Sequence, residues 1–167
     1  MWYKIKEGKH RASPLSLGIH LGKTREEYIV KFDESCLYEA LDWEDDTNKL
    51  VGWSYGFHHK NSIRVGWRPS RTKIGKIEIS LYTYDSGIRN ILYVGMIDVN
   101  KEYKMILEYF PKMSMITLFI DGVIKEETSL FDFVYSKMKP TWGYTLSTYF
   151  GGSFNSPKDM KIWLKKL

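Results

Sequence analysis

Apolar and polar residues alternate along much of the chain, and this alternation predicts β-strands. In the segment KIEISLYTY, Ile77, Ile79 and Leu81 fall on one face, while Tyr82 and Tyr84 fall on the other. The segments NSIRVGW, SMITLFID and DMKIWLKKL repeat the pattern. Because a period of two is typical of strands with one covered face, we expect strands at 2–6, 15–21, 26–33, 49–56, 61–68, 74–84, 88–98, 103–110, 114–121, 123–128, 143–150 and 158–165.

Turn-forming residues stand between these expected strands. They lie at Asp85-Ser86-Gly87, Asp121-Gly122, Gly151-Gly152 and Ser156-Pro157, where glycine accepts the positive φ that hairpin turns require. Helical periodicity is nearly absent, and only 34–43 and 129–139 are expected to form short helical turns. Many short strands joined by turns predict one all-β domain over residues 1–167, a two-sheet antiparallel β-sandwich.

Three segments of the second half resemble a known fold: YKMILEYF, ITLFIDGVIKEE and YTLSTYFGGSFNSPKDMKIWLKKL. From about Asn48 to Leu167 the chain resembles the concanavalin A-like lectin/glucanase superfamily, which implies a jelly roll. That fold serves lectins, glycoside hydrolases, polysaccharide lyases, pentraxins and viral surface proteins, so it does not assign a reaction. The stretch GFHHKNSIRVGWRPS also resembles uncharacterised jelly-roll proteins of gut bacteria and their tailed phages.

Composition narrows the classes of partner. The formal net charge is +5 and the sequence pI is near 9.1, which favours anionic partners. Lysine and arginine are spread along the chain and form no single basic tract, so we expect no nucleic-acid partner. The aromatic share of 16% is high, and tyrosine and tryptophan suit surfaces that stack on sugars or bind proteins.

The cellular location is constrained only weakly. Cys36 is the only cysteine, so no intrachain disulfide can form. The stretch MWYKIKEGKH lacks the apolar core of a signal peptide, and no apolar run is long enough to span a bilayer. These features fit a virion protein assembled in a reducing cytoplasm, so we expect a location on a virion or an extracellular surface.

The stretch GFHHKNSIRVGWRPS supplies the first candidate ligand site. The candidate residues of this stretch, and of the next strand if the two strands are adjacent, are His58, His59, Arg64, Arg68, Tyr82 and Tyr84. The two arginines alternate away from the apolar face of their strand, onto a face that the resemblance makes either a solvated back or a saccharide groove. Two guanidinium groups beside phenols can grip a uronate or a sulfate, because arginine matches such oxyanions bidentately.

A structural interpretation of the same stretch stays open. Residues 58–61 would then form a polar hairpin loop whose side chains cap backbone groups. Arg64 and Arg68 would pair with neighbouring carboxylates such as Glu78.

The stretch TWGYTLSTYFGG supplies a second candidate. Tyr144, Leu146, Thr148 and Phe150 are expected on one face of a strand, with Tyr149 on the other. Trp142 and Tyr149 are expected to form a stacking platform for a sugar ring. The alternative is that these aromatic residues close one end of the sandwich.

Catalytic machinery is largely missing from the sequence. Retaining jelly-roll glucanases carry a Glu-x-Asp-x-x-Glu type of pattern on one strand, and no expected strand has it. A lyase acting on anionic polysaccharide needs a cation and a proton-transferring Tyr or His; Arg64, Tyr82 and the two histidines offer these types. The further Arg-Glu and Gln-His motifs of jelly-roll lyases are absent, so we expect no catalytic residues.

One acidic segment, EALDWEDDTNK, offers oxygen ligands of the kind calcium prefers. A structural calcium ion would be held near Asp42, Asp45 and Asp46, with Glu44 and Asn48 as further oxygen donors. The spacing matches no defined calcium loop, so a solvated acidic loop is the main alternative. We expect no other metal or cofactor.

The sequence thus predicts a module that is not an enzyme and that binds a glycan, with an anionic glycan favoured, or assembles on a surface. We expect it in a homo-oligomer or multi-protein assembly, such as a phage head or fibre, where avidity compensates for weak single sites. Two other functions stay open. One is a lyase or other polysaccharide-degrading enzyme, and the other is a purely structural protein with no soluble ligand.

Overall fold

The structure is a computed structural model that describes residues 1–39, 47–122 and 130–167. Two short 3-10 helices, η1 (Glu34–Cys36) and η2 (Pro111–Met113), accompany the strands. The strands are β1 (Trp2–Ile5), β2 (Ala12–Ser13), β3 (Ile19–Leu21), β4 (Arg25–Phe32), β5 (Asn48–Ser54), β6 (Ser62–Pro69), β7 (Lys76–Asp85), β8 (Ile88–Asp98), β9 (Tyr103–Phe110), β10 (Met115–Gly122), β11 (Leu130–Tyr135), β12 (Trp142–Leu146) and β13 (Met160–Lys166).

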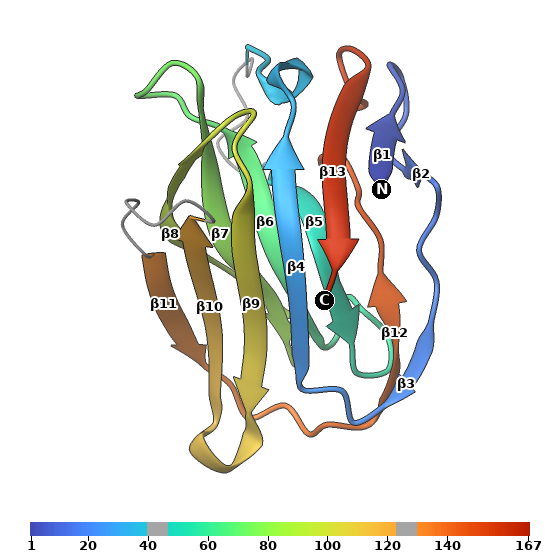
Figure 1. The fold of residues 1–167 in the computed structure, drawn as a ribbon. Coiled ribbons are helices and arrows are strands. Elements are labelled where there is room, and N and C mark those ends of the chain that lie inside the picture. The colour runs from blue at the N-terminus through green and yellow to red at the C-terminus, as the bar shows by residue number, and fades with distance from the viewer. Residues whose placement is uncertain (40–46, 123–129) are drawn as a thin grey trace.

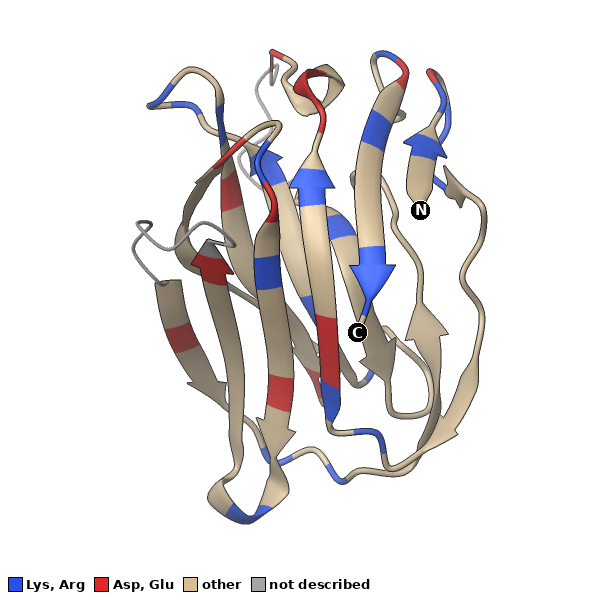
Figure 2. Ribbon diagram, in the orientation of Figure 1, with Lys and Arg blue, Asp and Glu red and all other residues tan. Residues whose placement is uncertain are grey.

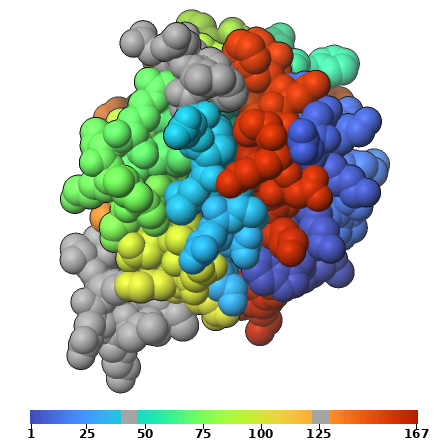
Figure 3. All heavy atoms as spheres, turned by 90° about the horizontal axis from the view of Figure 1, so that it is seen from above, coloured from blue at the N-terminus to red at the C-terminus, as the bar shows by residue number. Residues whose placement is uncertain are grey.

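The strands form two antiparallel sheets that lie face to face (Figure 1). Over the described residues, a seven-stranded sheet has the order β11-β10-β9-β4-β13-β1-β2, and a six-stranded sheet has the order β3-β12-β5-β6-β7-β8. Strand β1 pairs with β13, so the first and last strands stand side by side. Seen from above, the red C-terminal residues lie between the blue N-terminal residues and the light-blue segment that contains β4 (Figure 3). This is the all-β jelly-roll sandwich that the sequence predicts.

Alternating apolar residues of the two sheets meet between them and form the core. Strand β6 contributes Ile63, Val65 and Trp67, each at most 1% exposed. Strand β4 contributes Val30 and Phe32 from the opposite sheet, and the rings of Phe32 and Trp67 lie 5.1 Å apart between centroids. Full burial of a side chain of this size stabilises a fold by roughly 1.5–3 kcal/mol, so these contacts hold the two sheets together.

The outer face of the seven-stranded sheet carries solvated ion pairs. Arg25 on β4 contacts Glu27 on the same strand and Glu108 on β9. The ammonium nitrogen of Lys104 lies 2.8 Å from a carboxylate oxygen of Glu27. Figure 2 shows both signs of charge along β4 and β9. Because exposed pairs of this kind contribute little to stability, we interpret this part of the sheet as a solubilising surface.

Most strand boundaries agree closely with the predictions. The strands at 88–98 and 103–110 are confirmed as predicted, and seven others differ by one or two residues at either end. The strand expected at 15–21 is shortened to β3, and the one expected at 143–150 ends at Leu146. The strand expected at 123–128 lies outside the described residues.

Two local predictions are wrong. The segment expected to form a helical turn at 129–139 contains strand β11, which pairs with β10 over six residues. Asp121 and Gly122 do not form a turn, because both are paired with β9 inside β10. The turn at Asp85-Ser86-Gly87 is confirmed, with φ of 54° at Ser86 and 84° at Gly87. Of the helical turn expected at 34–43, only η1 is present in the described part, which stops at residue 39.

Candidate functional site

The outer face of the six-stranded sheet is lined by polar and aromatic side chains, and we call it the Arg64 face. The pairing of β6 with β5 and β7 assigns these residues to it: Lys49, Gly52, Ser54, Ser62, Arg64, Gly66, Arg68, Glu78, Ser80, Tyr82 and Tyr84. Ser62, Arg64, Ser80 and Tyr82 are less than 9% exposed, although they point away from the core. These side chains are therefore packed against one another over the sheet.

The register of β6 and β7 brings the predicted residues together. Arg64 lies directly opposite Tyr82, and Arg68 lies opposite Glu78. Tyr84 is two residues from Tyr82 on the same face, and their ring centroids are 5.9 Å apart. Strands β6 and β7 are adjacent, so the condition under which the two tyrosines flank the two arginines is fulfilled.

Arg64 is the buried cation of this face. It is 8% exposed, and its Nη2 donates a hydrogen bond to the carbonyl oxygen of Ser147 at 2.6 Å. Burial lowers the pKa of the Arg64 guanidinium to about 10, although the nearby phenols of Tyr82, Tyr144 and Tyr149 oppose the shift. The group is thus charged at neutral pH, and no described carboxylate forms an ion pair with it.

Arg68 is held in a different way. Its Nε donates to Oε2 of Glu78 at 2.7 Å, and the hydroxyl of Ser70 donates to the other carboxylate oxygen at 3.2 Å. The structural interpretation, in which Arg68 pairs with Glu78, is therefore confirmed for this residue. With Arg64 bonded to a backbone carbonyl and Arg68 to a carboxylate, the two guanidinium groups do not form an open bidentate clamp.

A second group of aromatic side chains extends the face beyond the arginines. His58 Nδ1 lies 2.6 Å from the phenol oxygen of Tyr144 on β12. The rings of His58 and His59 are 4.1 Å apart, and His59 meets Tyr84 edge-on at 5.7 Å. Burial lowers the pKa of His58, and electrostatic interactions with His59 and Arg64 add to the effect. His58, His59 and Tyr84 thus continue the aromatic surface from β7 to β12.

Lysine and tyrosine meet at the centre of the Arg64 face. Lys49 Nζ lies 5.0 Å from the ring centroid of Tyr82, within the range of a cation–π contact. The same ammonium donates to the carbonyl of Gly151 at 2.9 Å. Burial raises the pKa of Tyr82 to about 12, so its phenol stays protonated and can donate a hydrogen bond.

The sequence-based prediction missed Lys49 and Tyr144 as residues of this surface, and the case of Tyr144 is instructive. Tyr144 was expected on the face away from Tyr149, yet the phenols of both residues are close enough to Arg64 to raise the pKa of its guanidinium. The reason is that β12 ends at Leu146, so the alternation does not continue to Tyr149. Nothing in the sequence indicates that β12 lies beside β5, and only that pairing brings Tyr144 to the site.

Trp142 and Tyr149 do not form one platform. Trp142 is 54% exposed and lies opposite Leu21 of the edge strand β3. Tyr149 pairs with Lys49 and stacks on His10, with ring centroids 5.1 Å apart and planes 5° apart. Tyr149 therefore belongs to the surroundings of Arg64, and Trp142 belongs to the edge of the sheet.

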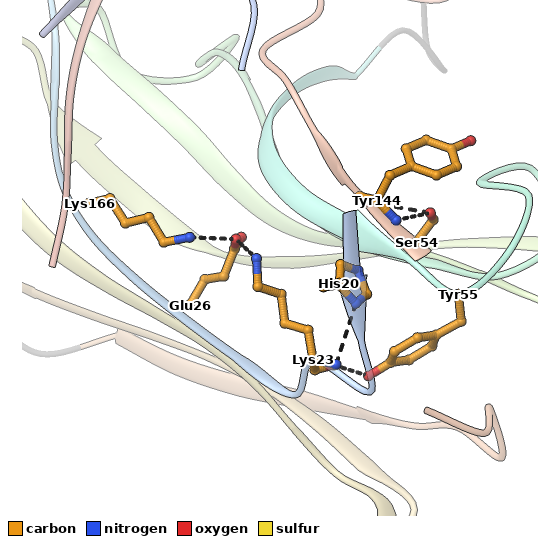
Figure 4. Close-up of polar contacts among 7 residues, drawn as sticks. All are labelled: His20, Lys23, Glu26, Ser54, Tyr55, Tyr144 and Lys166. Carbon is orange, nitrogen blue, oxygen red and sulfur yellow. Dashed lines mark hydrogen bonds and ion pairs between the residues drawn. The ribbon is translucent and has the colours of Figure 1, made fainter. Parts of the chain in front are cut away.

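A separate polar cluster lies where β3 turns into β4 (Figure 4). The Glu26 side chain is 0% exposed, and its Oε1 lies 2.5 Å from Lys23 Nζ and 3.4 Å from Lys166 Nζ. The backbone N–H of Lys23 donates to His20 Nδ1 at 3.4 Å, and the Tyr55 hydroxyl donates to the Lys23 carbonyl. These contacts hold the β3–β4 corner in place, so we assign the cluster a structural role.

The other chemical candidates give no site in the described residues. No group of three or more His, Cys, Asp or Glu side chains there could hold a metal ion. Asp42, Asp45 and Asp46, the expected calcium ligands, lie outside those residues. Asn48 is buried, and its Oδ1 accepts the N–H of Gly151 at 2.6 Å. Cys36 is buried, which raises its pKa to about 12 and makes it a poor nucleophile.

Comparison with known proteins identifies the fold. No protein-family model matches the chain, and no curated protein matches it. Among solved structures, the chain is similar to the CBM2 module of an evolved Dit of the Lactobacillus casei BL23 phage J-1, with a TM-score of 0.58 and 10% identity. That match covers 98% of this chain and 74% of the other.

A second solved structure also matches. It is the exoplasmic/lumenal domain of VIP36 in its Ca²⁺- and Man-bound form, with a TM-score of 0.43, 11% identity, and coverage of 99% of this chain and 83% of the other. The fold-level resemblance to concanavalin A-like jelly rolls is confirmed by the match to the phage module, whose TM-score is 0.58. Within the described residues, no helix is both long and apolar enough to cross a membrane.

Proposed function

We propose that the protein is a non-catalytic module that binds a glycan on its Arg64 face. The observation that carries the proposal is the aromatic surface of Tyr84, His59 and His58, which lies beside the buried side chains of Tyr82 and Arg64. Sugar rings stack on aromatic faces and hydrogen-bond to phenols and imidazoles at their edges. The jelly-roll fold of a phage carbohydrate-binding module supports the same function.

The charge of the face favours an anionic glycan. Arg64 has no carboxylate partner among the described residues, and the whole chain carries a net charge of +5. A carboxylate or sulfate beside the aromatic surface would be attracted by this charge. Because Arg64 is only 8% exposed, its charge acts on the ligand from beneath the surface, and the exposed ring of His59 and the half-buried rings of His58 and Tyr84 make the contact.

A glycan array with neutral and anionic glycans tests the proposal. We expect wild-type protein to bind an anionic group of glycans and His59→Ala/Tyr84→Ala to bind at least about tenfold more weakly. Tyr135→Ala removes an exposed tyrosine from the seven-stranded sheet and is expected to bind as wild type does. If the wild type binds no glycan on the array, the proposal is wrong and a purely structural role is favoured.

We further propose that the module works in a multi-copy assembly such as a phage particle. A module of a phage Dit shares its fold, and weak glycan sites gain affinity when several are held together. Mass spectrometry of purified particles is expected to find the chain as a component. Its absence from such particles would contradict this setting without affecting the glycan-binding proposal.

One observation favours a second function, that of a lyase. His58 and Tyr144 form a 2.6 Å hydrogen bond close to Arg64. Histidine and tyrosine are side chains that can transfer a proton in a lyase reaction. Lyase action on alginate, pectate or glycosaminoglycans would create an unsaturated sugar that absorbs ultraviolet light. Absorbance that stays flat across this panel would exclude it.

A further inference from the structure

An exposed apolar rim lies along β3, at the edge of the six-stranded sheet. Leu17 is 77% exposed, Ile19 is 88% exposed and Leu21 is 85% exposed. Leu15 and Trp142 extend the rim at 47% and 54% exposed. We call these five residues the β3 rim. Ile19 and Leu21 lie directly opposite Tyr144 and Trp142 on β12, so the rim continues the Arg64 face.

The backbone of β3 is open on the side away from β12. The carbonyl oxygen of Gly18 accepts the backbone N–H of Thr145 at 2.7 Å, and the backbone N–H of Gly22 donates to the carbonyl oxygen of Thr141 at 2.9 Å. In an antiparallel ladder, residue pairs that hydrogen-bond to each other alternate with pairs that do not. Gly18 and Gly22 belong to hydrogen-bonded pairs, so Ile19 and Leu21 belong to the other kind. The N–H and C=O groups of Ile19 and Leu21 therefore point away from β12. Strand β3 is the terminal strand of its sheet in the described part of the chain.

This edge lacks the usual protection. Edge strands normally carry lysine, proline or a bulge that prevents pairing with another chain. Between Leu15 and Gly22 the sequence LSLGIHLG has no charged residue and no proline. His20 points the other way and accepts the N–H of Lys23, so the corner in Figure 4 fixes β3 with its apolar side chains outward.

The size of the rim fits an interface. Each large side chain presents on the order of 100 Å² of apolar surface. The five residues of the β3 rim therefore present about 500 Å². A standard interface buries about 800 Å² per partner, of which a little over half is apolar. The rim therefore supplies the apolar share of one such interface, and few monomers expose a larger patch.

We propose that the β3 rim docks a second copy of this chain through antiparallel pairing of β3 with β3 about a two-fold axis. A short antiparallel strand is complementary to itself under such an axis. With the axis at His20, Ile19 of each copy lies opposite Leu21 of the other, and the outward backbone groups of both residues are paired. The two six-stranded sheets then form one sheet of twelve strands, and both Arg64 faces lie on the same side. This pairing does not depend on glycan binding.

Light scattering coupled to size exclusion tests the interface on the full chain. We expect a dimer or a higher even oligomer at about 10 µM, and Ile19→Lys/Leu21→Lys is expected to halve the mass, with at least a hundredfold weaker association. Ile74→Lys/Ile88→Lys is the matched control, because it charges two exposed isoleucines elsewhere, and it should leave the mass unchanged. A monomeric wild type, or dissociation by Phe133→Lys on β11 but not by the β3 variant, overturns the proposal.

A disulfide test checks the register. Ile19→Cys/Leu21→Cys is expected to form covalent dimers under oxidation, because residues 19 and 21 would face each other across the axis within disulfide reach. Ile19→Cys alone is expected not to cross-link. In the proposed register, residue 19 of the other copy lies two residues further along β3, beyond disulfide reach. Cys36 is buried and does not compete. Cross-linking of the single variant, or none of the double variant, contradicts the register.

Discussion

Arg64 combines a structural and an electrostatic role in one side chain. Its guanidinium satisfies the carbonyl of Ser147 where β12 ends, and it also places a positive charge under the aromatic surface. The alternation of β6 predicts which way this side chain points. Its burial could not be predicted, because it depends on Ser147, a residue 83 positions away.

Replacing Arg64 tests its structural role. We expect Arg64→Ala to lower the free energy of unfolding by about 2–4 kcal/mol, because it leaves the Ser147 carbonyl without its donor and opens a cavity. Urea denaturation measures the effect. Arg25→Ala, which removes an arginine from exposed ion pairs, should change stability only slightly. Equal losses in the two variants would contradict the structural role.

Two histidines make stability depend on pH near neutrality. Burial lowers the pKa of His20 below its ordinary value of 6.5; Lys23 adds to this shift, whereas Glu26 and Ser54 oppose it. Burial lowers the pKa of His58 as well. The unfolded chain therefore takes up protons before the folded chain does, so stability is full above about pH 6.5 and falls as the pH drops.

Urea denaturation at pH 7.5 and pH 5.5 measures this dependence, above the range in which most carboxyl groups titrate. We expect a lower free energy of unfolding at pH 5.5, and a smaller difference between the two pH values in His20→Gln/His58→Gln. Wild-type stability that rises toward pH 5.5 would contradict the direction of both shifts.

At the scale of elements, clean alternation was enough to predict strands with one covered face. Strands β8 and β9 match their predicted bounds. The prediction failed at β11, where Phe131, Phe133 and Tyr135 face outward while Leu130 and Val134 face inward. Because both faces of that strand carry apolar residues, its pattern does not distinguish a strand from a helical turn.

Strand β5 contains an irregularity that shapes the Arg64 face. Its pairing with β6 shifts between Lys49 and Gly52, and Gly52 has a φ of 152°. A Cβ at Gly52 would lie 2.1 Å from the Ile63 carbonyl oxygen and 2.7 Å from the Cα of Arg64. The absence of a side chain therefore allows β6 and Arg64 to approach β5 closely.

A substitution at this position tests the close approach. We expect Gly52→Ala to cost about 3 kcal/mol or more, because backbone atoms of β6 must move. Gly75→Ala is the control, since it also has a positive φ but no atom within 4 Å of the added Cβ, and it should cost only about 1–2 kcal/mol. Thermal unfolding compares the two, and similar losses would argue against a backbone clash.

The whole molecule separates two surfaces. The seven-stranded sheet carries ion pairs on β4 and β9, and the six-stranded sheet carries the aromatic surface and, at its edge, the β3 rim. The general fold could be predicted from the sequence, since many short alternating strands favour a sandwich. The site could be predicted only in part, because Tyr144 and Tyr149 reach it through pairings between distant segments.

The two proposals together predict avidity. If both Arg64 faces of a dimer meet one glycan-coated surface, the wild type should bind it about 10²–10⁴ times more tightly than Ile19→Lys/Leu21→Lys does. Biolayer interferometry on immobilised glycan measures the ratio, and soluble monovalent glycan should bind both forms equally. A ratio near one for a confirmed dimer would show that its two faces do not reach the same surface.

The pairing of β1 with β13 has a kinetic consequence. Trp2 lies opposite Trp163, so this part of the seven-stranded sheet forms only after the chain has closed the long loop between these two residues. Contacts of such long separation cost conformational entropy before they contribute energy, and proteins rich in them fold in milliseconds to seconds. During synthesis on the ribosome, β1 has only the two-residue strand β2 to pair with until β13 emerges.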